Sequence, residues 1–185
     1  AGHACVIEIN RCKKPIGKQD QYTAAYGRVN LLGFTPKGVT VEPIKCDTDA
    51  LSAHCLLLDT GLARQGDAGQ VLASQQQDRD DVRQLAKLAE MFADDLANGN
   101  LNGCGVVMHL AWEIKSRFVR NAQVNDWYTK AIDWGAWGGK LCGAGGGGFL
   151  LFLAPPERHS AIVQALGLRH VPIRVGVPGS EVIAT

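Results

Sequence analysis

Apolar residues recur every three or four positions in three stretches of the chain, which is the spacing of one face of a helix. These stretches are residues 82–96, 106–118 and 124–132. Acidic residues at 78–81 precede the first stretch, where they would stabilise the positive end of a helix. Asn98-Gly99 follows the first stretch and Gly135 follows the third, so both are predicted to end there. The sequence therefore predicts three amphipathic helices in succession.

Shorter apolar runs predict strands around these helices. Val29–Phe34 and Val39–Ile44 are joined by Thr35-Pro36-Lys37-Gly38, which indicates a hairpin. His54–Asp59 contains the continuous apolar run Cys-Leu-Leu-Leu and is typical of a buried central strand. Phe149–Ala154 and residues 168–177 predict two more strands. Between these two, Pro155-Pro156 opens a helix that runs to Leu166, with Gly167 after its end.

The remaining segments are short or polar. Residues 4–12 fit either the end of a helix or a short strand, and Lys18–Tyr26 predicts a short helix that Gly27 ends. Residues 62–77 read as a loop that passes into a helix. The order of strands, then helices, then strand–helix–strand predicts an α+β fold rather than a doubly wound α/β fold. A boundary near Thr48–Ala53 would divide the chain into residues 1–50 and 51–185.

Composition predicts a globular protein of the cytoplasm. Hydrophobic residues make up 46% of the 185 residues, charged residues 20%, and the formal net charge is +1. This balance gives no electrostatic case for binding nucleic acid or an anionic membrane. The most apolar run, Phe149–Ala154, is too short to cross a bilayer, and the N-terminus lacks a signal-peptide pattern. None of the six cysteines forms a Cys-x-x-Cys pair, so free thiols are expected.

The strongest local motif is glycine-rich. Five of the six residues at positions 143–148 are glycine, and the apolar run from Phe149 follows at once. Glycine is entropically costly, so such a run indicates positive φ angles or a close approach of another group. A loop of free N–H groups beside a strand can bind phosphate. From the residues alone, a tight turn between two closely packed strands is the alternative interpretation.

A second polar segment lies between Pro15 and Tyr22. Within it, Asp20 has the chemistry to orient or deprotonate a hydroxyl group. Lys18 could pair with Asp20 or with a phosphate. An ordinary helix start with an acidic residue in its first turn is the alternative interpretation. The five histidines lack metal-ligand spacing, so no metal site is predicted.

Four segments, taken in order, resemble one enzyme family. They are Gly-Lys-Gln-Asp-Gln-Tyr-Thr-Ala-Ala-Tyr-Gly at 17–27, Asp-Thr-Gly at 59–61, Ala-Trp-Glu-Ile-Lys at 111–115, and Gly-Gly-Lys-Leu-Cys-Gly-Ala-Gly-Gly-Gly-Gly-Phe-Leu-Leu-Phe at 138–152. This series resembles the GHMP kinases, and most closely the D-glycero-D-manno-heptose phosphate kinases.

The resemblance implies a two-domain α+β kinase. Residues 1–50 would be the truncated end of a ribosomal-S5-like N-terminal domain, and residues 51–185 a ferredoxin-like C-terminal domain. ATP and Mg²⁺ are the implied cofactors, and a sugar or sugar phosphate is the implied substrate. Asp20 would be the catalytic base or orienter of the acceptor hydroxyl. The implied substrate- and phosphate-adjacent residues are Lys18, Gln19, Gly143, Ala144, Gly145, Gly146, Gly147, Gly148, Lys140 and Arg64.

One part of the family pattern has no match in these residues. The loop Pro-x-x-x-Gly-Leu-Gly-Ser-Ser-Ala, which cradles nucleotide phosphates in the family, should precede residue 1, as should the Ser and Glu that hold magnesium. We therefore do not expect the chain alone to bind ATP. The resemblance favours a fragment or shortened homologue of a sugar or sugar-phosphate kinase. Two alternatives to this interpretation stay open. The chain could be an inactive relic that acts as an oligomerising binding module, with residues 29–44 near the contact, or a piece of a longer reading frame.

Overall fold

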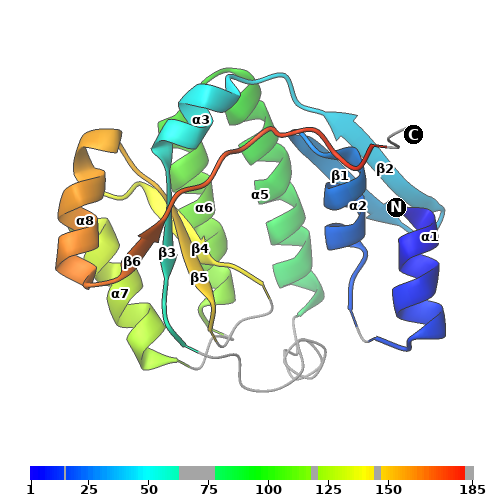
Figure 1. The fold of residues 1–185 in the computed structure, drawn as a ribbon, viewed down its shortest axis with the longest axis horizontal. Helices are drawn as coiled ribbons and strands as arrows, with labels where there is room; N and C mark the ends of the chain where they lie inside the picture. Colours follow the sequence, from blue (N-terminus) through cyan, green and yellow to red (C-terminus); the bar gives the residue numbers. More distant parts are fainter. Residues whose placement is uncertain (15, 63–77, 118–120, 144–146, 182–185) are drawn as a thin grey trace.

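The computed structural model describes residues 1–14, 16–62, 78–117, 121–143 and 147–181, and Figure 1 shows their arrangement. Its elements alternate between helices and antiparallel strands, which confirms the predicted α+β class. A small N-terminal group of helices and a hairpin lies beside a larger group built around a sheet.

The N-terminal group contains two helical segments and the hairpin. Helix α1 (Gly2–Cys5) continues into the π-helix η1 (Val6–Arg11), so residues 4–12 take the helical alternative. Helix α2 (Gln19–Tyr26) ends at Gly27, whose φ of 57° is in the region that favours glycine. Strands β1 (Asn30–Thr35) and β2 (Gly38–Pro43) pair antiparallel as the predicted hairpin, with Leu32 opposite Val41.

The larger group is built on a four-stranded sheet in the order β4-β5-β3-β6, with every pairing antiparallel. Strand β3 (Cys55–Asp59) lies inside this sheet, as predicted, and β5 (Phe149–Leu153) is its partner. Strand β4 (Gly138–Leu141) was not predicted. The strand predicted over residues 168–177 is shorter, because only β6 (Arg169–Val171) pairs with β3.

The three predicted central helices are all present. They are α5 (Arg79–Ala97), α6 (Leu101–Lys115) and α7 (Ala122–Asp133). Polar side chains cap their first turns: Asn100 accepts from the N–H of Gly103, and Asn121 accepts from the N–H groups of Gln123 and Val124. The predicted fourth helix begins as the 3-10 turn η2 (Pro156–Arg158) and continues as α8 (His159–Leu166), ending at the left-handed Gly167.

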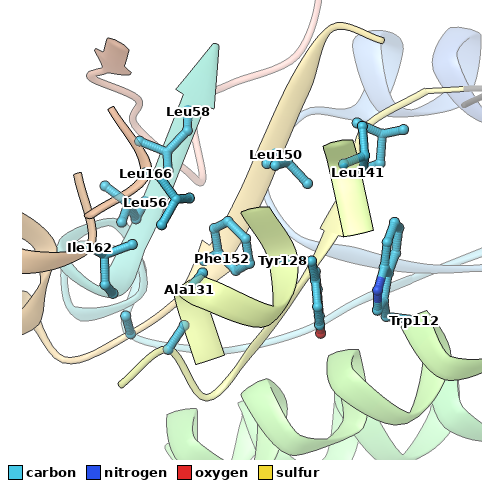
Figure 2. Packing of buried hydrophobic residues seen from close by; sticks show 13 residues of the cluster. Leu56, Leu58, Trp112, Tyr128, Ala131, Leu141, Leu150, Phe152, Ile162 and Leu166 are labelled. Atoms are coloured by element: carbon cyan, nitrogen blue, oxygen red, sulfur yellow. The ribbon is translucent and has the colours of Figure 1, made fainter. Parts of the chain in front are cut away.

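Both faces of the sheet are apolar, because alternate residues of β3 and β5 belong to two separate clusters. Leu56 and Phe152 point to one face, where they pack with residues of α7 and α8. Figure 2 shows this cluster, including Tyr128 beside Trp112, whose ring centroids are 4.7 Å apart. The opposite cluster joins the sheet to helices on the other side through Leu51, Cys55, Leu96, Cys104 and Leu153.

The C-terminal segment returns from β6 across the molecule to α2, as Figure 1 shows. On the way, the N–H of Val175 donates to the Ser52 hydroxyl at 3.0 Å. At α2, the carbonyl of Val177 accepts from the N–H of Arg28 at 2.6 Å, and the N–H of Ser180 donates to the carbonyl of Ala24 at 3.0 Å. The end of the chain therefore positions the helix that carries Asp20.

Helix α3 (Thr48–His54) occupies the place where the sequence suggested a domain boundary. Asp47 caps this helix by accepting from the N–H groups of Asp49 and Ala50. The division at residue 50 falls inside α3 and stays a prediction.

Two further properties follow from the described residues. All six cysteines are free, as expected. Of the helices that the structure describes, none combines the length and the apolar character needed to cross a membrane.

Candidate active site

A cavity of about 600 Å³ lies between the N-terminal group and the helices of the larger group. Its walls come from α2, β1, α5, α6, β4 and β5, so segments far apart in the sequence meet there. Most of the lining side chains are apolar, for example Leu88 and Phe92 of α5. Polar side chains are concentrated at α2 and at the ends of α6 and β4.

Helix α2 presents Gln19 and Thr23, one turn apart, to the cavity. The Thr23 hydroxyl donates to the carbonyl of Gln19 at 2.8 Å. On another side of the helix, Gln21 is buried and donates to the Glu8 carboxylate in η1 at 3.1 Å. Asp20 lies between these two faces in the first helical turn and is exposed. Asp20 is not among the residues that line the cavity.

Two lysines also line this cavity. Lys115 is the last residue of α6, and Lys140 lies in β4. Burial, and then the positive charge of Lys140, hold the pKa of Lys115 below its usual range. Burial also raises the pKa of the neighbouring Cys142 thiol, although both lysine charges act to lower it. Lys115, Lys140 and Cys142 thus form one group of electrostatically interacting side chains.

The glycine-rich motif connects β4 to β5. Gly143 and Gly148 have φ angles of 81° and 103°, which explains the need for glycine at these two positions. The carbonyl of Gly148 accepts from the N–H of Thr60 at 2.9 Å and from its hydroxyl at 2.6 Å, and the N–H of Gly148 donates to Leu62. The described part of the motif therefore serves as a turn between packed strands, attached to the end of β3.

The structure brings some of the predicted site residues together. Gln19 and Lys140 line one cavity, while Lys18 and Asp20 are exposed at the same end of α2. Gly143, Gly147 and Gly148 lie in the turn that follows Lys140, and Gly147 is buried. Arg64, Ala144, Gly145 and Gly146 lie outside the described residues.

Lys115 was missed from the sequence, although a signal was present. Met108, Ala111, Trp112 and Lys115 recur at helical spacing and all line the cavity. A lysine inside an apolar helical stripe is a departure from the amphipathic pattern. Residues 111–115, which end in Lys115, resemble the kinases, but the resemblance alone assigns no role to this lysine.

Comparison with known proteins gives the family. Residues 75–171 match the family described as GHMP kinases C terminal. The chain belongs to this family. The match covers α5 to β6 and therefore includes Lys115, Lys140 and the glycine-rich turn.

Individual relatives are heptose-phosphate and mevalonate kinases. The chain is 28% identical over 163 residues to a D-glycero-alpha-D-manno-heptose 7-phosphate kinase from Campylobacter jejuni, covering 81% of this chain and 48% of the relative. A D-glycero-D-manno-heptose 1-phosphate kinase from Bacteriodes thetaiotaomicron is similar over 98% of this chain and 54% of its own, with a TM-score of 0.70 and 24% identity.

A more distant relative has the same fold. The L. major mevalonate kinase structure, solved with R-mevalonate, has a TM-score of 0.64 and 19% identity, covering 88% of this chain and 53% of its own. The chain thus spans about half the length of the relatives it matches.

The magnesium implied by the kinase resemblance has no fitting site in the described residues. Among them, no group of three or more His, Cys, Asp or Glu side chains could hold a metal ion. In the glycine turn, Gly148 uses both its N–H and its carbonyl within the protein. No catalytic step is therefore assigned to a metal ion on these residues.

Proposed function

We propose that this chain forms the acceptor-binding side of an ATP-dependent sugar-phosphate kinase. The proposal rests on one observation, which is that Gln19 and Lys140 line the same cavity. Gln19 precedes Asp20 in the sequence, and Lys140 lies shortly before the glycine turn. The Campylobacter relative is a heptose 7-phosphate kinase, so a heptose 7-phosphate is the proposed acceptor.

The proposed chemistry is transfer of the γ-phosphoryl group of ATP to a sugar hydroxyl. Asp20 orients that hydroxyl and accepts its proton as the new O–P bond forms and the bond to ADP breaks. Gln19 and Thr23 offer hydrogen-bonding groups to the sugar from the same helix. The lysine charges lie in a cavity with mostly apolar walls, where they would stabilise anionic phosphate oxygens.

The ATP phosphates are assigned to no residue of this chain. The loop with the sequence Gly-Leu-Gly-Ser-Ser does not occur in its 185 residues. We propose that a separate segment supplies the nucleotide site and that the present residues supply acceptor binding and the base.

Acceptor binding is the direct test. The chain is titrated with heptose 7-phosphate in a calorimeter at two temperatures, because the heat of binding can vanish at one temperature. One-to-one saturable binding is expected. Absence of heat at both temperatures, with a cooperatively folded protein, would overturn the proposal.

The role of Asp20 is tested by kinetics, in any preparation of the protein that transfers a phosphoryl group from Mg-ATP. Asp20→Asn is expected to lower kcat by about a hundredfold or more while acceptor binding persists. Asp133→Asn is the control, because Asp133 is an exposed residue at the end of α7 and does not line the cavity. An unchanged kcat in Asp20→Asn would remove Asp20 from the mechanism.

A second candidate function is an oligomerising binding module. Tyr26 and Phe34 are 53% and 50% exposed, and Tyr22 contacts both rings. The β1–β2 sheet has only two strands in the described residues, so its outer edges remain available for pairing. Self-association between two copies through this aromatic cluster would cover it. Light scattering should then give a dimer or larger mass that Phe34→Ser reduces; a monomeric mass for the unaltered chain excludes it.

A further inference from the structure

The lysine end of the cavity is formed by unusually close packing of β4 on α6. At Gly138, even a β-carbon would meet the carbonyl oxygen of Gly105 in α6. The next residue, Gly139, donates its N–H to the Tyr128 hydroxyl at 3.2 Å. Because β4 is held in this position, Lys140 and the last residue of α6, Lys115, line the same cavity.

The two ammonium groups interact unfavourably in the free protein. Lys140 is a direct electrostatic cause of the lowered pKa of Lys115, and burial is the larger cause. All ion pairs among the described residues are elsewhere; their acidic partners are Asp59, Asp80, Asp81 and Asp126. Lys115 is the last residue of α6, where the helix dipole favours a positive charge.

An anion between the lysines would remove this repulsion. Two cations require a ligand with about two negative charges, which a phosphomonoester carries near neutral pH. The apolar walls at Trp112 and Leu151 reduce screening by water, so the attraction is stronger than at an exposed surface. The adjoining polar side chains of α2 are available to the non-phosphate part of the same ligand.

We propose that Lys115 and Lys140 form a binding site for the phosphate group of a phosphomonoester. On the proposed function, this group is the phosphate that the acceptor sugar already carries. The terminal phosphate of a nucleotide has the same chemistry, and the experiment below distinguishes these sources.

Substitution of Lys115 separates binding from stability. Lys115→Met keeps an unbranched side chain of similar length but removes the charge. If the lysine is present for a ligand, its removal relieves burial and repulsion, so the Tm of the free protein should rise while phosphate binding is lost. A lower Tm together with unchanged binding would make Lys115 a structural residue and overturn the proposal.

The binding experiment is calorimetric titration with inorganic phosphate, heptose 7-phosphate and Mg-ATP. The proteins are the unaltered chain, Lys115→Met, Lys140→Gln and the control Lys87→Gln, an exposed α5 lysine outside the cavity lining. Each site variant should weaken binding of inorganic phosphate about tenfold or more, and the control should not. Matching loss for heptose 7-phosphate assigns the site to the acceptor, and loss for Mg-ATP alone assigns it to the nucleotide. Equal affinities in all four proteins would refute the site.

Alkylation of Cys142 gives a second, independent measurement. The Cys142 thiol lies beside both lysines, so bound phosphate should slow its reaction with iodoacetamide. Peptide mass spectrometry measures the rate at this cysteine. An unchanged rate at saturating phosphate would count against the site. Failure of the proposed function looks different. In that case phosphate still binds in a lysine-dependent manner, but heptose 7-phosphate binds no better than inorganic phosphate.

Discussion

The hydroxyl of Tyr128 in α7 accepts a hydrogen bond from the backbone N–H of Gly139 in β4 at 3.2 Å. The same hydroxyl lies 3.0 Å from Nδ1 of His109 in α6. Burial raises the pKa of Tyr128, so the group stays a neutral phenol. One side chain therefore joins both helices to the strand that carries Lys140.

Tyr128→Phe should destabilise the protein by about 1–3 kcal/mol, because it leaves the N–H of Gly139 buried without an acceptor. Urea unfolding of both proteins measures the change. Tyr26→Phe is the matched control, since Tyr26 is 53% exposed, and it should leave the unfolding midpoint in place. Equal midpoints for all three proteins would mean that the Tyr128 hydrogen bond adds no net stability.

Gly138→Ala tests the close packing of β4 on α6. The new methyl group would meet backbone atoms of Gly105 and His109, which cannot rotate away as a side chain can. We expect a loss of about 2 kcal/mol or more in the free energy of unfolding, together with weaker phosphate binding as Lys140 moves from Lys115. Gly2→Ala is the control, because nothing lies within 4 Å of its added methyl group. A Gly138→Ala protein as stable as Gly2→Ala would contradict the packing argument.

Most helices and strands could be predicted because their apolar spacing and turn residues agree. Strand β4 could not, because Gly138 and Gly139 have little intrinsic tendency to form strands and are extended only where α6 and β5 pack on them. Helix α3 has seven residues, too few for a visible period, although Asp47 supplies a helix-start signal.

The candidate site was predictable in part. Asp20 and the glycine motif came from the resemblance, and Lys140 came with the motif. Lys115 was not recognised because Lys140, which lines the same cavity, is 25 positions away in the sequence (140 − 115) and is brought near only by the packing of β4 on α6. Side-chain proximity of this kind depends on tertiary contacts rather than on local pattern.

Gly27→Ala tests how the C-terminal segment positions α2. Gly27 combines a φ of 57° with a backbone contact: an added methyl group would meet Pro178 and Gly179. Gly167→Ala is the matched control, because it has a similar φ of 64° but nothing within 4 Å. Gly167→Ala should lower the free energy of unfolding by about 1 kcal/mol, from backbone strain alone. Gly27→Ala should lower it clearly more, because the backbone contact adds to the strain.

Hydrogen exchange shows where the Gly27→Ala effect lies. Amide protection of α2 and of the Arg28 N–H should fall, because the Val177 carbonyl is displaced. Protection of α7 should be unchanged. If both glycine variants lose the same stability and α2 keeps its protection, the C-terminal segment does not hold this helix.

Asp59 should make stability depend on acid pH. The N–H of Gly61 and the guanidinium of Arg169 hold the pKa of Asp59 below its usual value. The resulting stability is present above the unfolded-state pKa and is lost as pH falls through the lower folded-state pKa. Asp59→Asn should therefore be less stable than the unaltered chain at pH 7, and this gap should shrink toward about pH 3. Urea unfolding at both pH values measures this difference in stability, with Asp133→Asn as the control. A difference that stays constant with pH would show that the lowered pKa of Asp59 is not its cause.

The cysteines should react with alkylating reagents in an order set by burial. Burial raises the pKa of Cys55 and of Cys104 to about 11 in each case. At pH 8 only roughly 0.1% of either thiol would be ionised, and both side chains are also buried. Cys12 is exposed and should react first. Iodoacetamide treatment of the native chain followed by peptide mass spectrometry gives the order, and denaturant should make all six thiols react at similar rates. Early modification of Cys104 in the native state would show that the first turn of α6 opens locally, next to Gly105, on which β4 packs. Such opening would also weaken the case for a preformed lysine pair.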